Sequence, residues 1–443
     1  MAGASRTGTR TQPLDTRPGT GAPTPQPPRS FAGLCRILGP GLVAAATGVG
    51  AGDLVAATKA GAIHGLPLLW AAALGAVLKY ALAEGVARWQ LATGKTVLEG
   101  WVERFGTPVR VYFLLFLMLW SVMVAAALMS ACGLGAHALV PQLSVRVWAV
   151  VHGVLGLVFV WFGGYGAFER AMKIAIAAMF VAFIGAAVLQ APPLASTLRG
   201  LLVPTVPAGG TVLVLGVIGG VGGTLTLLSY NYWLEEKRWR GAEWAGAVRF
   251  DLSVGYLLTG LFGVAAIVLG STVLQPRGIT ISGSSGVLDM ATVLGDRFGR
   301  AGEIVFLVGF YAAVGTSLLG VWQGVPYLFG NYVGLLRGKS GEAMERCVSS
   351  RGAFYRGYVL YMTFPPMLLL LLDRPVWLVV AYAAVGALFM PFLAATLLAL
   401  NNRRSDLGRL KNGLIANATL LLALALFAYL AVQEIVTQVV ERR

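Results

Sequence analysis

Eleven long apolar runs, separated by short polar stretches, follow one another from Ile37 to near the end of the chain. Most of them approach or exceed the ~20 residues that an α-helix needs to cross the hydrocarbon of a bilayer. The pattern therefore predicts an all-α polytopic membrane protein. We expect spans at residues 37–60, 66–90, 109–133, 147–165, 171–191, 211–234, 250–274, 302–334, 354–372, 375–400 and 412–436.

Composition supports this class and excludes a soluble one. Of the 443 residues, 57% are hydrophobic and only 12% are charged, against about 25% charged in soluble domains. Residues 1–36 are rich in Pro, Gly, Thr, Ser and Arg and contain no apolar run, so we expect a disordered tail and not a signal peptide. The three cysteines have no paired spacing, which argues against a disulfide framework or a zinc site.

The net charge of +15 is explained by membrane topology without a nucleic-acid partner. With a cytoplasmic N-terminus, 24 Lys and Arg residues fall on the cytoplasmic side, eight fall on the other, and Lys59 and Lys79 lie within spans. This threefold bias follows the positive-inside rule. We therefore expect a multi-pass protein of the cell (inner) membrane, with its N-terminus cytoplasmic and its C-terminus outside.

Two glycine-rich interruptions suggest an internal repeat. Residues 48–54 read GVGAGDL in the first span, and residues 220–225 read GVGGTL in the sixth. The second copy lies five spans further along the chain, and because five is odd it enters the membrane from the opposite side. Paired glycine-broken segments in two inverted halves point to the binding site of a transporter. We expect repeats at about 37–191 and 211–400, with an extra helix at 412–436.

Several stretches of this chain are similar to the Nramp family of divalent-metal transporters. They are Gly39-Pro40-Gly41-Leu42-Val43, Leu68-Leu69-Trp70, Val86-Ala87-Arg88, Thr93-Gly94, residues 200–207 (GLLVPTVP), Met390-Pro391-Phe392 and Asp406-Leu407-Gly408. The resemblance covers most of residues 37–436. It implies a LeuT-like inverted-repeat fold with eleven or twelve helices, of which the first and sixth are broken at mid-membrane. It also implies transport of a divalent cation.

The motifs for metal binding depart from the family pattern. The metal-binding aspartate of the family's DPGN motif falls at Gly50, and its asparagine falls at Asp53. The metal-binding methionine falls at Gly223, and the glutamine of the tenth helix falls at Ala383. The third helix, which usually holds acids of the proton path, has none here. The scaffold of the family is therefore present without most of its metal ligands.

Asp53 is the strongest candidate ligand, because a carboxylate within a broken apolar helix is costly unless it is paired or hydrated. It is interpreted as a cation ligand or proton carrier, and also as a cap of the half-helix that follows it. Glycine carbonyls and nearby hydroxyls add oxygen ligands that suit hard cations, although such hydroxyls also bond to their own helix. The predicted substrate-binding residues are Asp53, Gly50, Thr47, Gly223, Thr224 and Thr226, with Asp53 as the metal ligand.

Lys79 lies in the middle of the predicted span 66–90, and Glu84 follows five residues later. One interpretation is that Lys79 pairs with Asp53 or Glu84, so that a fixed positive charge replaces a bound ion. The other is that its side chain reaches to the membrane interface. If Lys79 neutralises Asp53, a neutral or anionic organic substrate becomes the better expectation. We also expect the aromatic run at residues 230–233 to form an interfacial belt.

The sequence thus predicts a secondary transporter of the Nramp type that moves a divalent cation by alternating access, with altered selectivity and without the family's usual proton coupling. Alternatives are a transporter of an amino acid or another small organic solute on the same fold, and a scaffold that no longer transports. No nucleotide loop or nucleophile motif is present, so we expect neither an enzyme nor a cofactor. The expected partners are the bilayer and a small cation or solute, with no nucleic acid.

Overall fold

The computed structural model describes residues 25–440 except 191, 221, 280–285, 373–385 and 387. In this part of the chain the regular elements are helices, and no strand occurs. The α-helices are α1 (Phe31–Ile37), α2 (Pro40–Gly48), α3 (Ala51–His64), α4 (Leu69–Thr93), α5 (Val97–Leu139), α6 (Val145–Phe162), α7 (Tyr165–Leu189), α8 (Leu194–Leu202), α9 (Thr211–Gly220), α10 (Ser229–Glu236), α11 (Ala245–Leu269), α12 (Gly286–Leu336), α13 (Gly341–Val348), α14 (Ala353–Leu370), α16 (Phe389–Asn401), α17 (Arg404–Leu407) and α18 (Leu414–Val440).

The predicted spans coincide with these helices. Each of the eleven overlaps a helix, although most of the first half of span 375–400 lies outside the described residues. Within the described part, eight helices are long and apolar enough to cross a membrane, or nine if the bent pair α1 and α2 forms one span. Residues 1–24 of the predicted tail are not described, but Phe31–Ile37 forms α1, capped by Ser30. Residues 31–36 of the predicted tail are therefore helical.

Local signals in the sequence set where helices begin and bend. Thr96 and Glu99 form a reciprocal capping box at the start of α5, which satisfies two backbone N–H groups. Gly106 then bends α5 at a φ of 71°, and Gly299 bends α12 at a φ of 70°. Positive φ values of this kind favour glycine, which has no Cβ. Both long helices therefore consist of a short leading segment and a longer segment that follows the bend.

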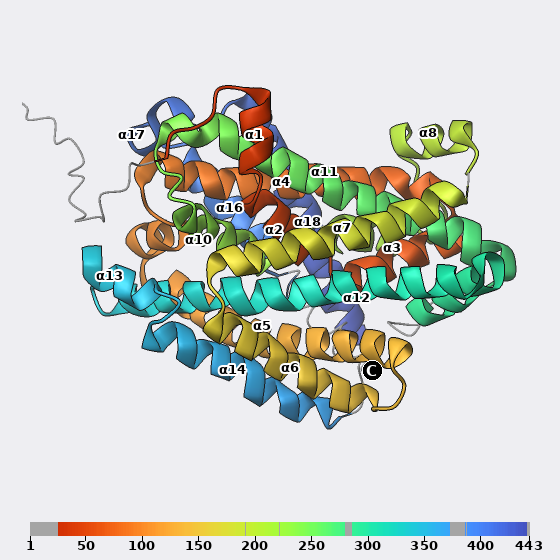
Figure 1. Cartoon of the computed structure of the whole chain (residues 1–443). Coiled ribbons are helices and arrows are strands. Elements are labelled where there is room, and N and C mark those ends of the chain that lie inside the picture. The colour runs from red at the N-terminus through yellow and green to blue at the C-terminus, as the bar shows by residue number, and fades with distance from the viewer. Residues whose placement is uncertain are drawn as a thin grey trace, which may run out of the picture.

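The helices pack side by side into one bundle, with α8 and α13 at its opposite ends (Figure 1). Helix α12 contacts α5, α7, α14 and α2, and α11 contacts α4, α2, α3 and α7. The short helix α2 is therefore enclosed by α7, α11 and α12. This places the first broken span in the interior of the bundle.

Helices α2 and α11 approach each other through glycines. A Cβ on Gly41 would lie 2.1 Å from the carbonyl oxygen of Asp251, and a Cβ on Gly255 would lie 2.3 Å from the carbonyl oxygen of Gly41. Contacts this short leave no room for a methyl group. Small residues at helix crossings are how membrane helices bring their backbones together.

We expect Gly255→Ala to lower the stability of the protein by about 1–3 kcal/mol, because the added methyl group overpacks the crossing. Gly246→Ala on the same helix is the matched control, since a Cβ there meets nothing within 4 Å. Thermal unfolding of both purified variants in detergent measures the difference. Equal unfolding temperatures for the two variants would show that the close approach has no energetic weight.

Candidate functional site

The first broken span is interrupted between α2 and α3. Helix α2 ends at Gly48, α3 begins at Ala51, and Val49 and Gly50 have non-helical backbone angles. The break leaves backbone carbonyls without helical hydrogen bonds, and hydroxyl groups of α12 donate to them. Thr316 donates to the carbonyl of Ala46 (3.0 Å), and Ser317 donates to the carbonyls of residues 47 (3.1 Å) and 49 (2.8 Å). These carbonyls are therefore held by α12 instead of facing an open cavity.

The second broken span is interrupted between α9 and the short 3₁₀ helix η2 (Leu225–Leu228), which leads into α10. Gly222 has a φ of 89° and Gly223 a φ of 77°. Other residue types rarely adopt this conformation, so the helix is interrupted here because two glycines are present. The break lies at the place that the glycine pattern predicts.

The two breaks touch each other. A Cβ on Gly48 would lie 2.7 Å from the carbonyl carbon of Gly222, and a Cβ on Gly223 would lie 3.3 Å from the Cα of Gly48. The contact is therefore between backbones, with no side chain between them. We call this region the junction: Gly48, Gly50 and Asp53 on one side, and Gly222 and Gly223 on the other.

Asp53 caps α3 and also faces the second break. It is the third residue of α3, and its Oδ2 accepts a hydrogen bond from the backbone N–H of Gly50 at 3.0 Å. A Cβ on Gly220 would lie 3.0 Å from Asp53 Oδ1, so the end of α9 packs directly on the carboxylate. The capping role that the sequence suggested is therefore present, at a position where the same carboxylate borders both breaks.

Lys79 reaches the junction from α4. The residue is 0% exposed, and its Nζ donates a hydrogen bond to the carbonyl oxygen of Gly223. Its aliphatic stem packs against Gly222, in the break that the Asp53 carboxylate also borders. The Nζ also lies 5.6 Å from the centre of the Phe427 ring of α18. The side chain therefore points into the bundle and does not extend to the interface.

Glu84 belongs to a different charge cluster. Its carboxylate pairs with Arg88 and with Arg249 of α11, both at 3.0 Å. Five residues along an α-helix turn the side-chain direction by about 140°, so Glu84 and Lys79 leave α4 on different sides. Of the two partners proposed for Lys79, Glu84 is therefore corrected, and the hydrogen bond of Lys79 goes to the carbonyl of Gly223, in the break that Asp53 also borders.

The predicted threonines lie around the junction. The Oγ1 of Thr47 is buried without a hydrogen-bond partner among the described residues, and Thr226 Oγ1 would lie 2.6 Å from a Cβ on Gly223. A Cβ on Gly386 would lie 3.2 Å from Thr224 Cγ2 and 3.5 Å from Trp120 Nε1. The breaks thus carry hydroxyl groups, as predicted from the sequence.

The charged side chains of the junction do not form a metal centre of familiar composition. Among the described residues, no group of three or more His, Cys, Asp or Glu side chains is placed to hold a metal ion. The junction contains a single carboxylate, that of Asp53, and the ammonium group of Lys79 bonds to the Gly223 carbonyl of the same junction. Ala383, which matches the family's glutamine, lies outside the described residues.

Asp251 is an acid of the interior that our sequence reasoning passed over. It is fully buried in α11 and accepts hydrogen bonds from the backbone N–H groups of Gly39 (3.0 Å) and Gly41 (2.5 Å) and from the hydroxyl of Tyr230 (2.9 Å). It therefore anchors the start of α2. The sequence did contain a signal for this residue: Asp251 falls within the predicted span 250–274, where an acid needs internal partners.

The aromatic run at residues 230–233 is buried, so the expectation of an interfacial belt is wrong. Tyr230 bonds to Asp251, and the side-chain amide of Asn231 donates to Gln90 Oε1 at 2.6 Å. Trp233 donates to Gln323 Oε1 at 2.7 Å. These polar atoms find partners on α4, α11 and α12, so that α10 is bonded into the centre of the bundle instead of facing lipid.

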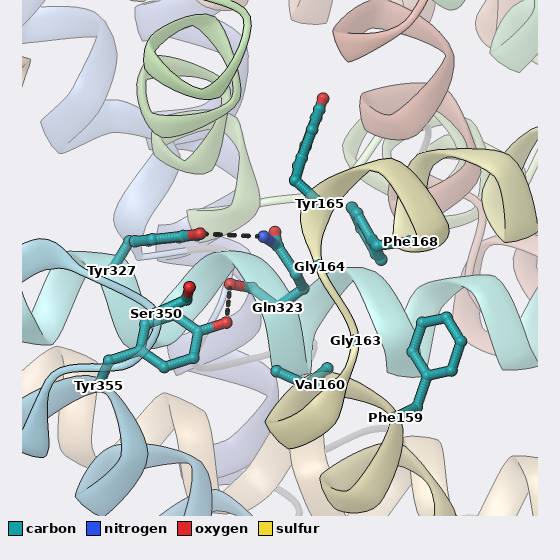
Figure 2. Close-up of a pocket in the computed structure, with 10 residues that line it drawn as sticks. All are labelled: Phe159, Val160, Gly163, Gly164, Tyr165, Phe168, Gln323, Tyr327, Ser350 and Tyr355. Atoms are coloured by element: carbon teal, nitrogen blue, oxygen red, sulfur yellow. Dashed lines mark hydrogen bonds between the residues drawn. The ribbon is translucent and has the colours of Figure 1, made fainter. Parts of the chain in front are cut away.

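A pocket lies near the turn between α6 and α7 (Figure 2). Its polar groups come from Tyr165, Gln323, Tyr327, Ser350 and Tyr355, and the hydroxyl of Tyr355 donates to the carbonyl of Gln323 at 2.8 Å. No residue of its lining belongs to the junction. The pocket and the two breaks are therefore separate features of the molecule.

Comparisons with known proteins place these features in a context. Residues 41–437 match the sequence model of the family described as "Nramp: Natural resistance-associated macrophage protein-like". The divalent metal cation transporter MntH of Bacillus subtilis is 24% identical over 320 residues, which cover 70% of this chain and 71% of that protein. The MntH of Mycobacterium tuberculosis is 24% identical over 315 residues, which cover 66% and 70%.

Solved structures show the same fold. The manganese transporter of Eremococcus coleocola superposes with a TM-score of 0.77 at 15% identity, over 93% of this chain and 89% of that one. MhsT in complex with L-phenylalanine superposes with a TM-score of 0.54 at 16% identity, over 91% and 100%. At these identities the likeness concerns the fold: a LeuT-like helical bundle with broken helices, as the sequence resemblance implied.

We expect Ser317→Ala to destabilise the protein by about 1–3 kcal/mol, because it leaves buried carbonyls of the first break without a donor. The exposed Ser340, whose side chain makes no capping bond, provides the control Ser340→Ala, which we expect to be near neutral. Unfolding temperatures in detergent compare the two. Equal unfolding temperatures for the two variants would show that the Ser317 hydroxyl does not stabilise the first break.

Proposed function

This chain belongs to the Nramp family, and on that premise we propose that it is a secondary transporter working by alternating access around the junction. The family consists of transporters and not of enzymes. Relatives such as the MntH proteins are named as divalent metal cation transporters. We propose a divalent cation as the substrate here too, with a selectivity altered by the residues of the junction.

The observation that carries this proposal is the backbone contact between the two breaks at Gly48 and Gly222. Transporters of this architecture bind their substrate where two half-helices meet, and one repeat then rocks against the other around that fixed site. The Asp53 carboxylate packs on the end of α9, and Lys79 bonds to the carbonyl of Gly223, so two opposite charges border the same break. Ionisable groups inside a bilayer are rare and mark the paths and binding sites of solutes.

The donor atoms favour a hard cation. Asp53 offers a carboxylate, Thr47 and Thr226 offer hydroxyls, and Gly223 offers its carbonyl. All are oxygen atoms, the ligand type that Mg²⁺, Ca²⁺ and Mn²⁺ prefer. Gly223 stands where the family has a methionine, so the soft thioether that favours softer transition metals is missing.

Proton coupling would differ from the family pattern. No acid occurs between Glu103 and Glu169, so the membrane-crossing part of α5 has none. A proton path through carboxylates of α5 is therefore not available, and we propose that transport is passive or coupled through another group.

A second candidate is a small organic solute with a hydrogen-bond acceptor, such as a carboxylate. It is favoured by the donor groups near the second break. The indole Nε1 of Trp120, which can only donate, is buried without a partner among the described residues and lies beside Thr224. Lys79 adds an ammonium group at the same break. Metal binding uses acceptors, so these donors would suit the organic solute better.

We expect Asp53→Asn to reduce uptake of Mn²⁺ and Mg²⁺ into proteoliposomes by about tenfold or more, since losing a charged ligand removes about 1.5–3 kcal/mol of binding. The exposed Asp289 of α12 supplies the control Asp289→Asn, which should transport normally. Parallel flux measurements with amino acids and dicarboxylates test the second candidate. Metal uptake that is unaffected by Asp53→Asn would reject the junction as the metal site.

We also propose that the N-terminus lies in the cytoplasm of an inner-membrane protein, as the distribution of Lys and Arg indicates. Cys35 of α1 is the one exposed cysteine among the three, because Cys132 and Cys347 are buried. A membrane-impermeant maleimide should therefore label Cys35 only after cells are permeabilised. Ser196 of α8 is exposed on the opposite side of the predicted topology, so Ser196→Cys should be labelled in intact cells. Labelling of Cys35 in intact cells would invert the topology.

A further inference from the structure

We propose that the ammonium group of Lys79 is a resident cation: it occupies the position where a substrate cation would be held, and it therefore sets which cations bind and how tightly. The inference rests on the proposed function, because it concerns the same junction. It goes further because it attributes the altered cation selectivity to one residue, Lys79, which lies on α4, outside both breaks.

The partners of Lys79 are the groups that a cation would need. Its Nζ bonds to the carbonyl of Gly223 and lies in the field of the Asp53 carboxylate. A metal ion requires direct contact with such oxygen atoms, at 2.0–2.6 Å for Mg²⁺ or Ca²⁺. The ammonium group already holds the carbonyl oxygen of Gly223, so a metal ion would compete with it for this oxygen and would bring a second positive charge near Asp53.

The position of Lys79 is fixed by packing. The side chain is completely buried, and a Cβ on Gly222 would lie 3.3 Å from both its Cβ and its Cγ. The stem therefore runs along the second break in tight contact with the backbone of Gly222. Such burial of an ammonium group is costly unless a carboxylate and a hydrogen-bond acceptor compensate it. Asp53 and Gly223 provide both.

Other charged groups near α4 are engaged elsewhere. Glu84, Arg88 and Arg249 form their own cluster. From α11, Tyr256 packs on Gly222 with a buried hydroxyl that has no partner among the described residues. From α18, Phe427 presents its ring to the ammonium group. In the described structure, the charge that faces Lys79 is therefore that of Asp53.

These neighbours also offer the ammonium group an alternative place. A cation near an aromatic ring face is stabilised, more strongly where water is excluded, and the Nζ is already 5.6 Å from the Phe427 ring centre. The Tyr256 hydroxyl can accept a hydrogen bond. A cation that binds Asp53 and Gly223 would displace the ammonium group toward these residues, against the repulsion between two positive charges.

The test measures metal binding to the purified full-length protein by titration calorimetry, with Mn²⁺ and Mg²⁺ as probes. Lys79→Gln should increase the affinity for both ions by about tenfold or more, because it frees the oxygens and removes the repulsion. Lys79→Arg, which keeps the charge, should not. The double variant Asp53→Asn/Lys79→Gln should lose the gain. Lys95→Gln is the matched control, since Lys95 pairs with Glu103 on the exposed surface.

Chemical rescue provides a second measurement that does not depend on the stability of one variant. Lys79→Ala removes three methylene groups and the ammonium group, which propylammonium can replace. The free amine should raise the unfolding temperature of Lys79→Ala and compete with Mn²⁺ for binding to it. It should do neither in the wild-type protein. An amine without effect on Lys79→Ala would overturn the proposal.

Failure of this inference and failure of the transport function give different results. Equal metal affinities for the wild type and Lys79→Gln would overturn the resident cation, even if uptake depends on Asp53. Metal binding that is absent from every variant would also overturn it. A gain in affinity without metal flux in any variant would support the role of Lys79 and reject divalent-cation transport.

Discussion

A broken helix inside a membrane must find internal partners for its backbone groups, because hydrocarbon offers none. This constraint shapes the centre of the protein. Hydroxyls of α12 bond to the carbonyls of the first break, Asp53 bonds to an N–H group of that break, and Lys79 bonds to a carbonyl of the second. Asp251 does the same for the start of α2. The polar residues of the interior can therefore be understood first as partners of unwound backbone, and then as candidates for binding.

The hydrogen bonds that satisfy the unwound backbone also determine which oxygen atoms are available to a substrate. Each carbonyl that already holds a protein donor is unavailable until that donor moves. The two breaks therefore differ from an open cage of ligands, since Ser317 holds carbonyls of the first break and Lys79 holds the carbonyl of Gly223 in the second. A solute has to be exchanged against protein groups, and its affinity is the difference between two sets of contacts. Affinity and conformational change are coupled by this exchange.

The sequence was informative where a single local signal decides the outcome. Apolar runs located the spans, and glycine clusters located both breaks, because positive φ at residues such as Gly222 depends on glycine itself. Asp53 and Lys79 stood out as charges within apolar runs. The sequence did not indicate that Ser317 supports the first break or that Tyr230 is buried, since either residue would look the same on a lipid-facing or interfacial helix. It misplaced Glu84 because its partner Arg249 is distant in the chain and becomes a neighbour only through folding.

The ring of Phe427 beside Lys79 has a consequence for the eleventh span. Helix α18 contacts α4, α9 and α16. Through Phe427 it also reaches the ammonium group of Lys79 at the centre of the bundle. This helix is thus part of the electrostatic environment of the junction, and is more than a peripheral attachment. Gain or loss of this helix among related proteins would alter the dielectric surroundings of the Lys79 charge. Helix number and substrate chemistry would then change together in the evolution of such a fold.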